Sequence, residues 1–396
     1  MRSEKKWIAY VGPFPFPWGQ AASRRMFGIA QSFAEGGYDV VVASGEAGPI
    51  IPKVVRDCGA GTVFRVGLSE LPAPGTGLFR KGVRAFFSWG ARTVRWLNSM
   101  PAPALVLVYG GGAPYASRLL RWGRKNNVPI AFDVVEWYEA SHVPGGMLNP
   151  FIISSEFCMR GLYPRADGII AISSYLEEHY SPAVEPVVRV PPTLDVRALD
   201  SAGYARSSKM PYRLVYAGTP GKKDALPLIL AAVAEADPEG NRIVIEVIGV
   251  DAREGSTVTS GSGSSPGVRF LGRIPQSEVA AHVRDADFSV LLRESERFAS
   301  AGFPTKFVES LSAGTPVISN LTSDLGRYLI DGVNGIVVDE CSVDALVCAF
   351  REMMLLGTEE LERMRIEARR VALEAFDYRN YREVLVEFAQ RLERAM

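Results

Sequence analysis

The stretch from Gly302 to Asn320 (GFPTKFVESLSAGTPVISN) gathers residue types that can hold a phosphate beside a sugar. Pro304 suits the first turn of a helix, because the N–H group that it lacks would be unpaired there anyway. The free N–H groups and positive dipole end of such a helix favour an anion. Thr305 adds a hydroxyl and Lys306 an ammonium at the same spot, and Glu309 can accept hydrogen bonds from sugar hydroxyls. The alternative is an ordinary surface helix with a solvated Lys and Glu.

The remainder of this stretch predicts how the helix is held. Phe307, Val308 and Leu311 mark its apolar face, and Gly314 is expected to end it in a left-handed conformation. Thr315–Ser319 then has the composition of a short buried strand.

A second glycine-rich segment, Ala217–Leu230 (AGTPGKKDALPLIL), follows the apolar run RLVY. Its glycines free the backbone, and either Lys222 or Lys223 stands where the next helix begins. A cation there would face the same wall as Lys306, and two positive charges suit one diphosphate. The alternative is an exposed lysine pair, and the sequence does not decide which of the two lysines points inward.

The loop after the first expected strand is GPFPFPWGQAASRR, from Gly12 to Arg25. Gly19 and the small residues after it would let backbone N–H groups approach a phosphate or a sugar. The loop lacks the GxGxxG spacing, so dinucleotide binding is disfavoured.

A further polar loop, Phe132–Gly145 (FDVVEWYEASHVPG), follows another expected strand. Glu136, Trp137 and His142 are the candidate functional residues of this loop. A single His is more often structural than catalytic, so both interpretations of His142 stay open.

Composition describes a soluble globular α/β protein of two or three domains: 396 residues, 47% hydrophobic and 22% charged. Lys plus Arg and Asp plus Glu balance at 44 each, so net charge does not indicate nucleic-acid binding. The four cysteines lack CxxC spacing, which favours a reducing compartment and no zinc site. The N-terminus enters a strand directly, without the apolar run of a signal peptide or membrane span. We therefore expect a cytoplasmic protein.

One region departs from this charge balance. From Leu71 to Phe132 there is no acidic residue, and between Phe79 and Leu97 cations alternate with Phe and Trp. A basic helix with an aromatic face is typical of a surface that rests on anionic lipid, at the inner face of a membrane. The alternative is a helix whose aromatic residues face its own core.

Short apolar runs alternate with helical patterns along the chain, which predicts parallel sheets with crossover helices. In the first half the expected strands are Trp7–Val11, Asp39–Ala43, Thr62–Val66, Ala104–Tyr109, Ile130–Val134, Gly168–Ala171 and Val187–Val190. In the second half they are Arg213–Tyr216, Ile243–Ile248, Val268–Leu271, Phe288–Leu291, Val317–Ser319 and Ile336–Val338. We expect domains at 1–199 and 200–375, a linker near Asp200–Pro211, a flexible loop at Glu254–Gly267, and a C-terminal helix, 376–396, packed back on the first domain.

Taken together, these segments resemble family 4 glycosyltransferases. AGTPGKKD resembles the family's glycine-then-lysine donor loop, and GFPTKFVESLSAGTPVI resembles its nucleotide-sugar helix. RYLIDGVNGIVV resembles the family's closing segment, while GQAASRR, AISSYLEEHY and PPTLD agree more loosely. The resemblance covers most of the chain and implies the GT-B fold, two doubly wound Rossmann-like domains facing a central cleft.

The resemblance also implies roles for individual residues. The catalytic candidates are Lys223, Lys306 and His142. The donor-binding candidates are Gly19, Gly218, Thr219, Lys222, Arg293, Phe303, Pro304, Thr305 and Glu309. Glu136 and Trp137 are placed on the acceptor side.

The chain departs from the family at one position. The family's E-x7-E pattern ends here at Glu309, but its first Glu is replaced by Ala301, and Glu294 and Glu296 are out of register. Asp285-Ala286-Asp287 is formally a DxD metal motif, yet it leads into a buried strand, and the resemblance implies neither a metal nor a cofactor.

The function that follows is retaining transfer of a sugar from a nucleoside diphosphate sugar to a hydroxyl acceptor. A glycan or lipid-linked intermediate of surface polysaccharide synthesis is the expected acceptor, and nucleic acid is not an expected partner. Two alternatives stay open, a sugar-nucleotide epimerase on the same fold and a non-catalytic scaffold that binds the nucleotide sugar.

Overall fold

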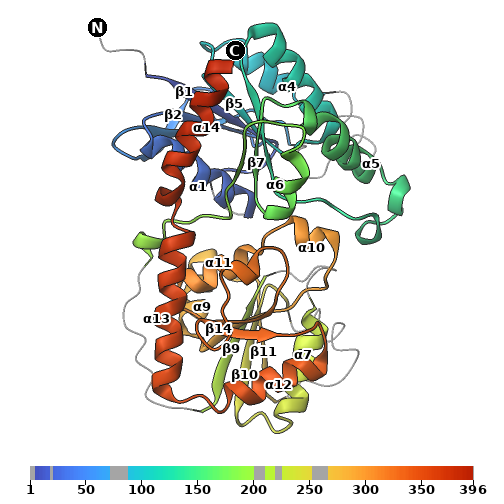
Figure 1. Cartoon of the computed structure of the whole chain (residues 1–396), viewed down its shortest axis with the longest axis vertical. Helices are drawn as coiled ribbons and strands as arrows, with labels where there is room; N and C mark the ends of the chain where they lie inside the picture. The colour runs from blue at the N-terminus through green and yellow to red at the C-terminus, as the bar shows by residue number, and fades with distance from the viewer. Residues whose placement is uncertain are drawn as a thin grey trace. The chain divides into compact units, whose positions relative to one another are not determined.

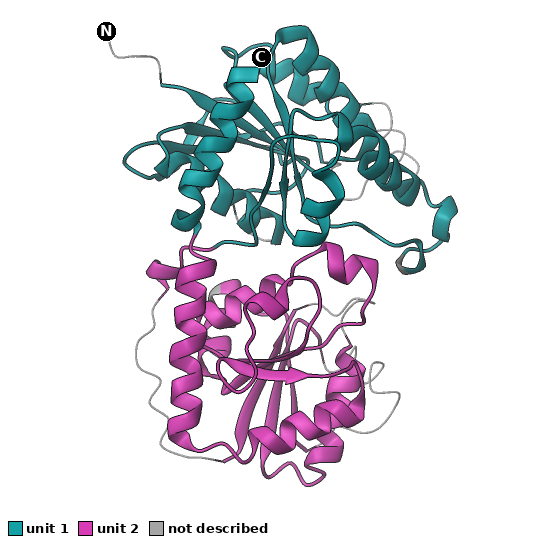
Figure 2. Cartoon of the chain, viewed as in Figure 1, with its two compact units in different colours: residues 1–193, 378–396 teal, residues 194–377 magenta. Residues whose placement is uncertain are grey.

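The structure is a computed structural model that describes residues 5–17, 21–71, 88–199, 210–218, 225–251 and 266–395. The chain forms two compact units (Figure 2). Unit 1 comprises Met1–Thr193 and Tyr378–Met396, and unit 2 comprises Leu194–Asp377. The chain thus enters unit 2 after residue 193 and leaves it after residue 377, where the sequence suggested 199 and 375. The expected linker and the expected loop at 254–267 lie almost wholly outside the described residues.

Unit 1 is built on an eight-stranded sheet of order β3-β4-β2-β1-β5-β6-β7-β8 (Figure 1). Its strands are β1 (Trp7–Val11), β2 (Asp39–Ser44), β3 (Lys53–Asp57), β4 (Thr62–Gly67), β5 (Leu105–Tyr109), β6 (Ile130–Val134), β7 (Gly168–Ala171) and β8 (Val187–Arg189). Its main helices are α1 (Ala21–Glu35), α3 (Ala91–Leu97), α4 (Gly112–Asn126), α5 (Pro150–Phe157), α6 (Ser174–Tyr180) and α14 (Arg382–Ala395). Every strand pair is parallel except β3 with β4.

The central strands of unit 1 are buried along their length, as expected for parallel strands whose sheet has helices on both faces. All five residues of β5 and of β6 are buried. The C-terminal helix α14 belongs to this unit, where Leu385 and Phe388 join the same core cluster as Phe33 of α1. Tyr38 fixes the far end of α14 by donating a hydrogen bond of 2.8 Å to Glu393.

Unit 2 has a six-stranded, wholly parallel sheet of order β11-β10-β9-β12-β13-β14. Its strands are β9 (Tyr212–Ala217), β10 (Ile243–Ile248), β11 (Val268–Gly272), β12 (Phe288–Leu291), β13 (Val317–Asn320) and β14 (Gly335–Val338). Its helices are α7 (Leu226–Ala236), α9 (Gln276–Asp285), α10 (Arg297–Ala301), α11 (Thr305–Ser312), α12 (Val343–Met353) and α13 (Thr358–Ala375). Two doubly wound α/β units are therefore confirmed.

Helix α11 forms as its sequence predicts, with one correction. Phe307, Val308 and Leu311 are buried, and Gly314 has φ of 72°, which confirms the left-handed stop. Pro304, however, lies one residue before the helix in an extended conformation rather than in its first turn. The missing N–H of a proline is as harmless at that position as inside the first turn.

In each sheet the strand order reverses at one place, between β1 and β5 in unit 1 and between β9 and β12 in unit 2. Ligands of open α/β sheets bind at the carboxyl ends of the strands beside such a reversal. These two edges are therefore where a functional site is sought.

The expected strands are all present, and the structure adds β3, which the sequence patterns did not predict. Its residues KVVRD are mostly exposed because β3 is an antiparallel edge strand, so no buried apolar run marks it. Of the basic aromatic segment 79–97, residues 79–87 lie outside the described residues. In the described part, which includes α3, Trp96 is buried while Arg92 and Arg95 are exposed, as the alternative of aromatic residues that face their own core predicts. Of the helices that the structure describes, none has both the length and the apolar character needed to cross a bilayer.

Candidate functional site

Lys306 is the centre of the candidate site in unit 2. It lies in the first turn of α11, and its Nζ is 3.1 Å from the hydroxyl of Tyr216 at the end of β9. The same Nζ stands 4.2 Å from the centroid of the Tyr216 ring, a cation–π distance. Tyr216 is buried, with 1% of its surface exposed, whereas Lys306 is half-buried. A rigid aromatic side chain thus holds the ammonium at the carboxyl edge of the sheet.

Gly218 provides the space for this arrangement. A Cβ atom at this position would lie 2.3 Å from Lys306 Cε and 2.6 Å from Lys306 Nζ. The residue also has φ of 149°, a backbone conformation that favours glycine. Gly218 and Lys306 were predicted separately from the sequence, and the structure brings them into contact.

The start of α11 directs other polar groups to the same edge. The first hydrogen bond of this turn runs from the Phe307 N–H to the Pro304 carbonyl at 3.1 Å, and no side chain caps the helix. The backbone N–H groups of Thr305 and Lys306 precede that bond, at the positive end of the helix dipole. Thr305 and Glu309, one turn apart, are both half-buried, so each keeps a surface that a ligand can reach.

Arg293 and Asn320 tie together the next two strand ends. The Arg293 N–H donates to Asn320 Oδ1 at 3.0 Å, and Asn320 Nδ2 donates to the Arg293 carbonyl at 2.6 Å. Arg293, a predicted donor-binding residue, is 7% exposed. Asn320 was not predicted, although an amide that ends the buried strand VISN is the signal that could have indicated it.

The ring of Phe303, a predicted donor-binding residue, packs in the core of unit 2 and is not available to a ligand. The ring lies edge-on to Phe307, Tyr328 and Phe376, at centroid distances of 6.3, 5.8 and 5.9 Å. Ser323 donates a hydrogen bond to the Gly302 carbonyl. Both contacts fix the turn that opens α11.

The positions of the E-x7-E pattern and of the DxD pattern have different surroundings in unit 2. Ala301, which replaces the family's first Glu, is fully buried at the end of α10, while Glu294 is exposed. Asp287 of the DxD pattern lies before β12, at the opposite edge of the sheet from Lys306. Its carboxylate accepts a hydrogen bond of 2.6 Å from the Arg213 backbone N–H. Asp287 therefore joins the starts of two strands.

The corresponding edge of unit 1 holds a buried ion pair that the sequence patterns did not predict. Arg25 of α1 donates to both carboxylate oxygens of Asp133 in β6, with Nη2 2.7 Å from Oδ1. Its Nη1 donates to the Val190 carbonyl at 2.8 Å, and Tyr10 of β1 donates its hydroxyl to Asp133. Arg25 and Asp133 are each 3% exposed. Burial disfavours the charged guanidinium, but the attraction of Asp133 outweighs it and raises the Arg25 pKa.

The acceptor-side candidates occupy different environments in unit 1. Trp137 is buried, and its indole N–H donates to Glu156 at 2.9 Å. Glu136 is half-buried and accepts a hydrogen bond from the Tyr138 hydroxyl. His142 ends the short helix Ala140–His142, and its side chain lies outside the described part of the chain. Glu136 is thus less buried than Trp137, and the acceptor-side roles remain predictions.

Four of the predicted site residues, Gly19, Thr219, Lys222 and Lys223, lie outside the described residues. Their roles remain predictions.

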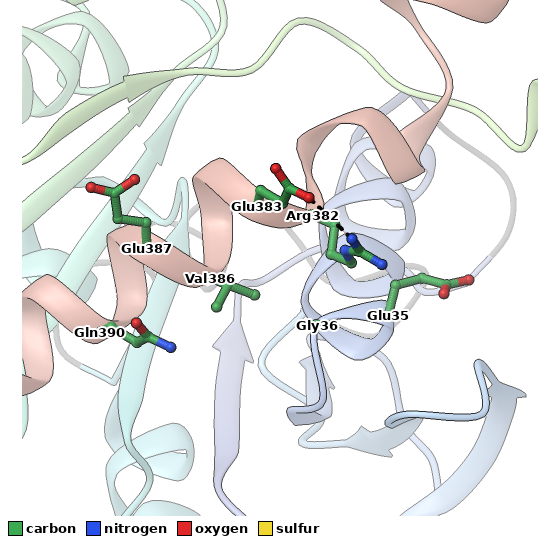
Figure 3. Close-up of a pocket in the computed structure, with 7 residues that line it drawn as sticks. All are labelled: Glu35, Gly36, Arg382, Glu383, Val386, Glu387 and Gln390. Carbon is green, nitrogen blue, oxygen red and sulfur yellow. Dashed lines mark hydrogen bonds and ion pairs between the residues drawn. The ribbon is translucent and has the colours of Figure 1, made fainter.

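A surface hollow of about 400 Å³ lies in unit 1 and includes none of the candidate residues (Figure 3). It is formed where the end of α1 meets α14, and its lining residues are Glu35, Gly36, Arg382, Glu383, Val386, Glu387 and Gln390. Three carboxylates among these seven residues make it unsuited to a phosphate, so the hollow is not the candidate site.

Comparison with known proteins agrees with the two units. Residues 21–193 match the family model of a glycosyl transferase 4-like domain, and residues 205–371 match that of glycosyl transferases group 1. A protein described as an uncharacterized glycosyltransferase of Methanocaldococcus jannaschii is 32% identical over 96 residues, or 24% of this chain. The match spans 25% of that relative's length.

Two solved structures show the extent of the likeness in fold. Sucrose-phosphate synthase from Thermosynechococcus elongatus matches 99% of this chain and 100% of its own, with a TM-score of 0.76 and 15% identity. Anabaena HepE in complex with UDP matches 97% of this chain and 100% of its own, with a TM-score of 0.65 and 14% identity.

Proposed function

Since its two halves match the two domain models of these enzymes, the chain belongs to the GT-B glycosyltransferases, and we propose that it transfers a sugar from a nucleoside diphosphate sugar to a hydroxyl acceptor with retention at the anomeric carbon. Unit 2 binds the nucleotide sugar, and Glu136 and His142 of unit 1 face the acceptor and the reacting sugar.

The observation that carries this proposal is the seating of Lys306. A half-buried ammonium, fixed by Tyr216 and lying against the Gly218 backbone, stands beside the amide groups that open α11. Each group suits the oxygen atoms of a diphosphate, and hydrogen bonds that involve a charged partner contribute about 1.5–3 kcal/mol. Glu309, one turn later, accepts hydrogen bonds from the ribose hydroxyls.

The chemistry requires stabilisation of the departing diphosphate more than a strong base. Lys306, the Thr305 hydroxyl and the first amides of α11 lie where negative charge grows as the sugar leaves, which is the arrangement that lowers such a barrier. Lys223 or Lys222 adds a second cation, and Arg293 approaches from the end of β12. The leaving phosphate takes the proton of the acceptor hydroxyl on the same face of the sugar. No step in this scheme calls for a metal.

A uridine nucleotide is the first donor to test. Structures in this fold class include Anabaena HepE with UDP and with UDP-glucose. The acceptor that we propose is a glycan or lipid-linked intermediate of surface polysaccharide synthesis, reached from the cytoplasmic side of a membrane.

A thermal-shift screen against UDP, GDP, ADP and their sugars tests the donor site. We expect one nucleotide to raise the unfolding temperature and Lys306→Ala to weaken that nucleotide's binding at least about tenfold. Lys53→Ala, which removes an exposed lysine from unit 1, serves as the matched control. If Lys306→Ala bound the nucleotide as tightly as the Lys53→Ala control, the diphosphate site would be misassigned.

Product analysis tests the reaction itself. NMR of the product from a donor of known anomeric configuration should show that configuration kept. An inverted product would overturn the retaining mechanism, and an epimerised donor without transfer would overturn sugar transfer.

A further inference from the structure

An apolar surface of unit 1 has no role in the donor site. Five large side chains on α5 and on the short helix Gly146–Leu148 before it are exposed, and we call them the α5 face. They are Met147 (66% exposed), Leu148 (86%), Phe151 (49%), Ile153 (55%) and Phe157 (55%). Scattered exposed apolar residues are ordinary, but five within eleven residues form a patch that needs a partner.

The orientation of α5 fixes these side chains outward. Ile152 is the one residue of α5 that is buried, and Ser154 accepts a hydrogen bond of 2.9 Å from the Ala113 N–H at the start of α4. Asn149 caps the helix through the Phe151 N–H at 2.9 Å. Helices α4 and α5 contact each other on the same side of the sheet (Figure 1). The inner side of α5 is thus attached to the fold, and its apolar residues project from the other sides.

The next turn anchors this segment to the core. Glu156 joins the indole N–H of Trp137 at 2.9 Å to the Arg160 guanidinium at 2.7 Å, and that guanidinium lies 5.0 Å from the Trp137 ring centroid. Trp137 is 2% exposed. The α5 face is therefore presented by a rigid support.

Basic residues outnumber acidic ones in the part of unit 1 that carries this face. The stretch 88–167 contains eight Lys and Arg and five Asp and Glu residues. The basic residues are Arg92, Arg95, Arg118, Arg121, Arg124, Lys125, Arg160 and Arg165, and the acidic ones are Asp133, Glu136, Glu139, Glu156 and Asp167, of which Asp133 is paired with Arg25. The chain as a whole has no net charge, so this stretch has an excess of positive charge that the rest of the chain balances. Two copies of such a surface would repel each other, which disfavours a second copy of this chain as the occupant.

We propose that the α5 face docks on an anionic lipid bilayer, with Leu148, Phe151 and Phe157 entering the headgroup boundary and the cations of α4 meeting lipid phosphates. Apolar side chains flanked by Lys and Arg are the combination that binds such surfaces. The inference builds on the proposed function, because a transferase with a lipid-linked acceptor must work at the bilayer. It adds a described surface to the segment 79–97 that the sequence suggested.

Vesicle flotation with the full-length protein tests this surface without any sugar transfer. We expect the protein to float with vesicles of phosphatidylglycerol and phosphatidylcholine in equal amounts, and to stay behind with phosphatidylcholine alone. The triple variant Leu148→Gln, Phe151→Gln, Phe157→Gln should bind the mixed vesicles at least about tenfold more weakly. Arg121→Gln, Arg124→Gln, Lys125→Gln should weaken binding and reduce its dependence on ionic strength.

A matched control changes equally exposed apolar residues of unit 2, Leu355→Gln and Ile366→Gln, which are 84% and 60% exposed in the native chain. This variant should float as the unchanged protein does. If the α5-face variant also floated unchanged, or if the native protein bound neither kind of vesicle, the proposal would be wrong. Self-association of the native protein that the α5-face variant abolishes, without vesicle binding, would assign the surface to a second copy instead.

The nucleotide thermal shift separates this proposal from the function on which it rests. The α5-face variant should keep the full shift. Loss of nucleotide binding in Lys306→Ala with normal flotation, and loss of flotation in the α5-face variant with a normal shift, would show that the two sites act separately.

Discussion

The two units have equivalent strand edges, yet each edge uses its cation differently. Beside β1 and β5, Arg25 is 3% exposed and its guanidinium donates to Asp133 and to backbone carbonyls. Beside β9 and β12, Lys306 is half-buried and lies on a phenol and a glycine. The same topology thus produces a structural clamp in unit 1 and a surface that can receive a ligand in unit 2. Burial and partners, not position in the fold, distinguish the two tasks.

The largest effect is expected from breaking the clamp. Asp133→Ala leaves the Arg25 guanidinium buried without its carboxylate, which should lower the free energy of unfolding of unit 1 by about 3–5 kcal/mol. All six tryptophans precede residue 194, so tryptophan fluorescence during urea unfolding reports on unit 1. The double variant Arg25→Met, Asp133→Leu removes both charges and should recover most of the loss. A loss below about 1 kcal/mol in Asp133→Ala would contradict the clamp.

A smaller effect, on binding, is expected from Gly218→Ala. Its Cβ would displace the Lys306 ammonium, since the two would lie within 2.6 Å. We expect nucleotide affinity to fall about tenfold, equivalent to about 1.4 kcal/mol, in a calorimetric titration. Gly332→Ala is the control, because Gly332 also has positive φ but nothing lies within 4 Å of the place that its Cβ would take. Equal losses in the two variants would mean that backbone strain, rather than the position of Lys306, weakens binding.

The sequence predicted the parts of unit 2 that depend on local patterns. The apolar face of α11, the glycine stop at Gly314 and the alternation of strands and helices all follow from neighbouring residues, and all are present. Gly218 and Lys306 were predicted from motifs in the same way. The sequence did not predict that Gly218 and Lys306 are in contact, because that contact depends on how the sheet folds.

Three features escaped prediction for related reasons. Asp133 reaches Arg25 across 108 positions of the sequence, so no spacing rule could pair them. Tyr216 has the pattern of an ordinary buried strand residue, and only its hydroxyl at the strand end gives it a second role. The exposed apolar residues of α5 were not singled out, because composition alone does not tell which side of a helix the fold covers.

Tyr216→Phe sharpens the account of Lys306. The change removes the hydroxyl that Nζ contacts at 3.1 Å but keeps the ring beneath the ammonium. Loss of one hydrogen bond of about 0.5–1.5 kcal/mol should weaken nucleotide binding several-fold. Tyr212→Phe, which removes a hydrogen bond to Leu356 from the other end of β9, should leave nucleotide affinity unchanged. If the two variants bound alike, Tyr216 would contribute to packing and not to the position of the ammonium.

The smallest expected effect concerns pH and the support beneath the α5 face. The ring centroids of His179 and Trp137 are 4.7 Å apart. Burial, and after it the positive charge of Arg160, lowers the pKa of His179 below the ordinary 6.5. The folded state therefore binds fewer protons at this site than the unfolded chain. The contribution of His179 to the free energy of unfolding is therefore complete above pH 6.5 and decreases as the pH falls below that value.

Urea unfolding followed by tryptophan fluorescence, at neutral pH and at about pH 5, measures this contribution. The native protein should lose slightly more stability on acidification than His179→Gln, because glutamine does not take up the proton. An identical pH dependence in both proteins would show that His179 titrates as it does in the unfolded chain. If Asp133→Ala lowers the free energy of unfolding by the same amount at both pH values, the ion pair of Arg25 and Asp133 is formed at both. The two tests therefore distinguish the contribution of this buried ion pair from that of the protonation of His179.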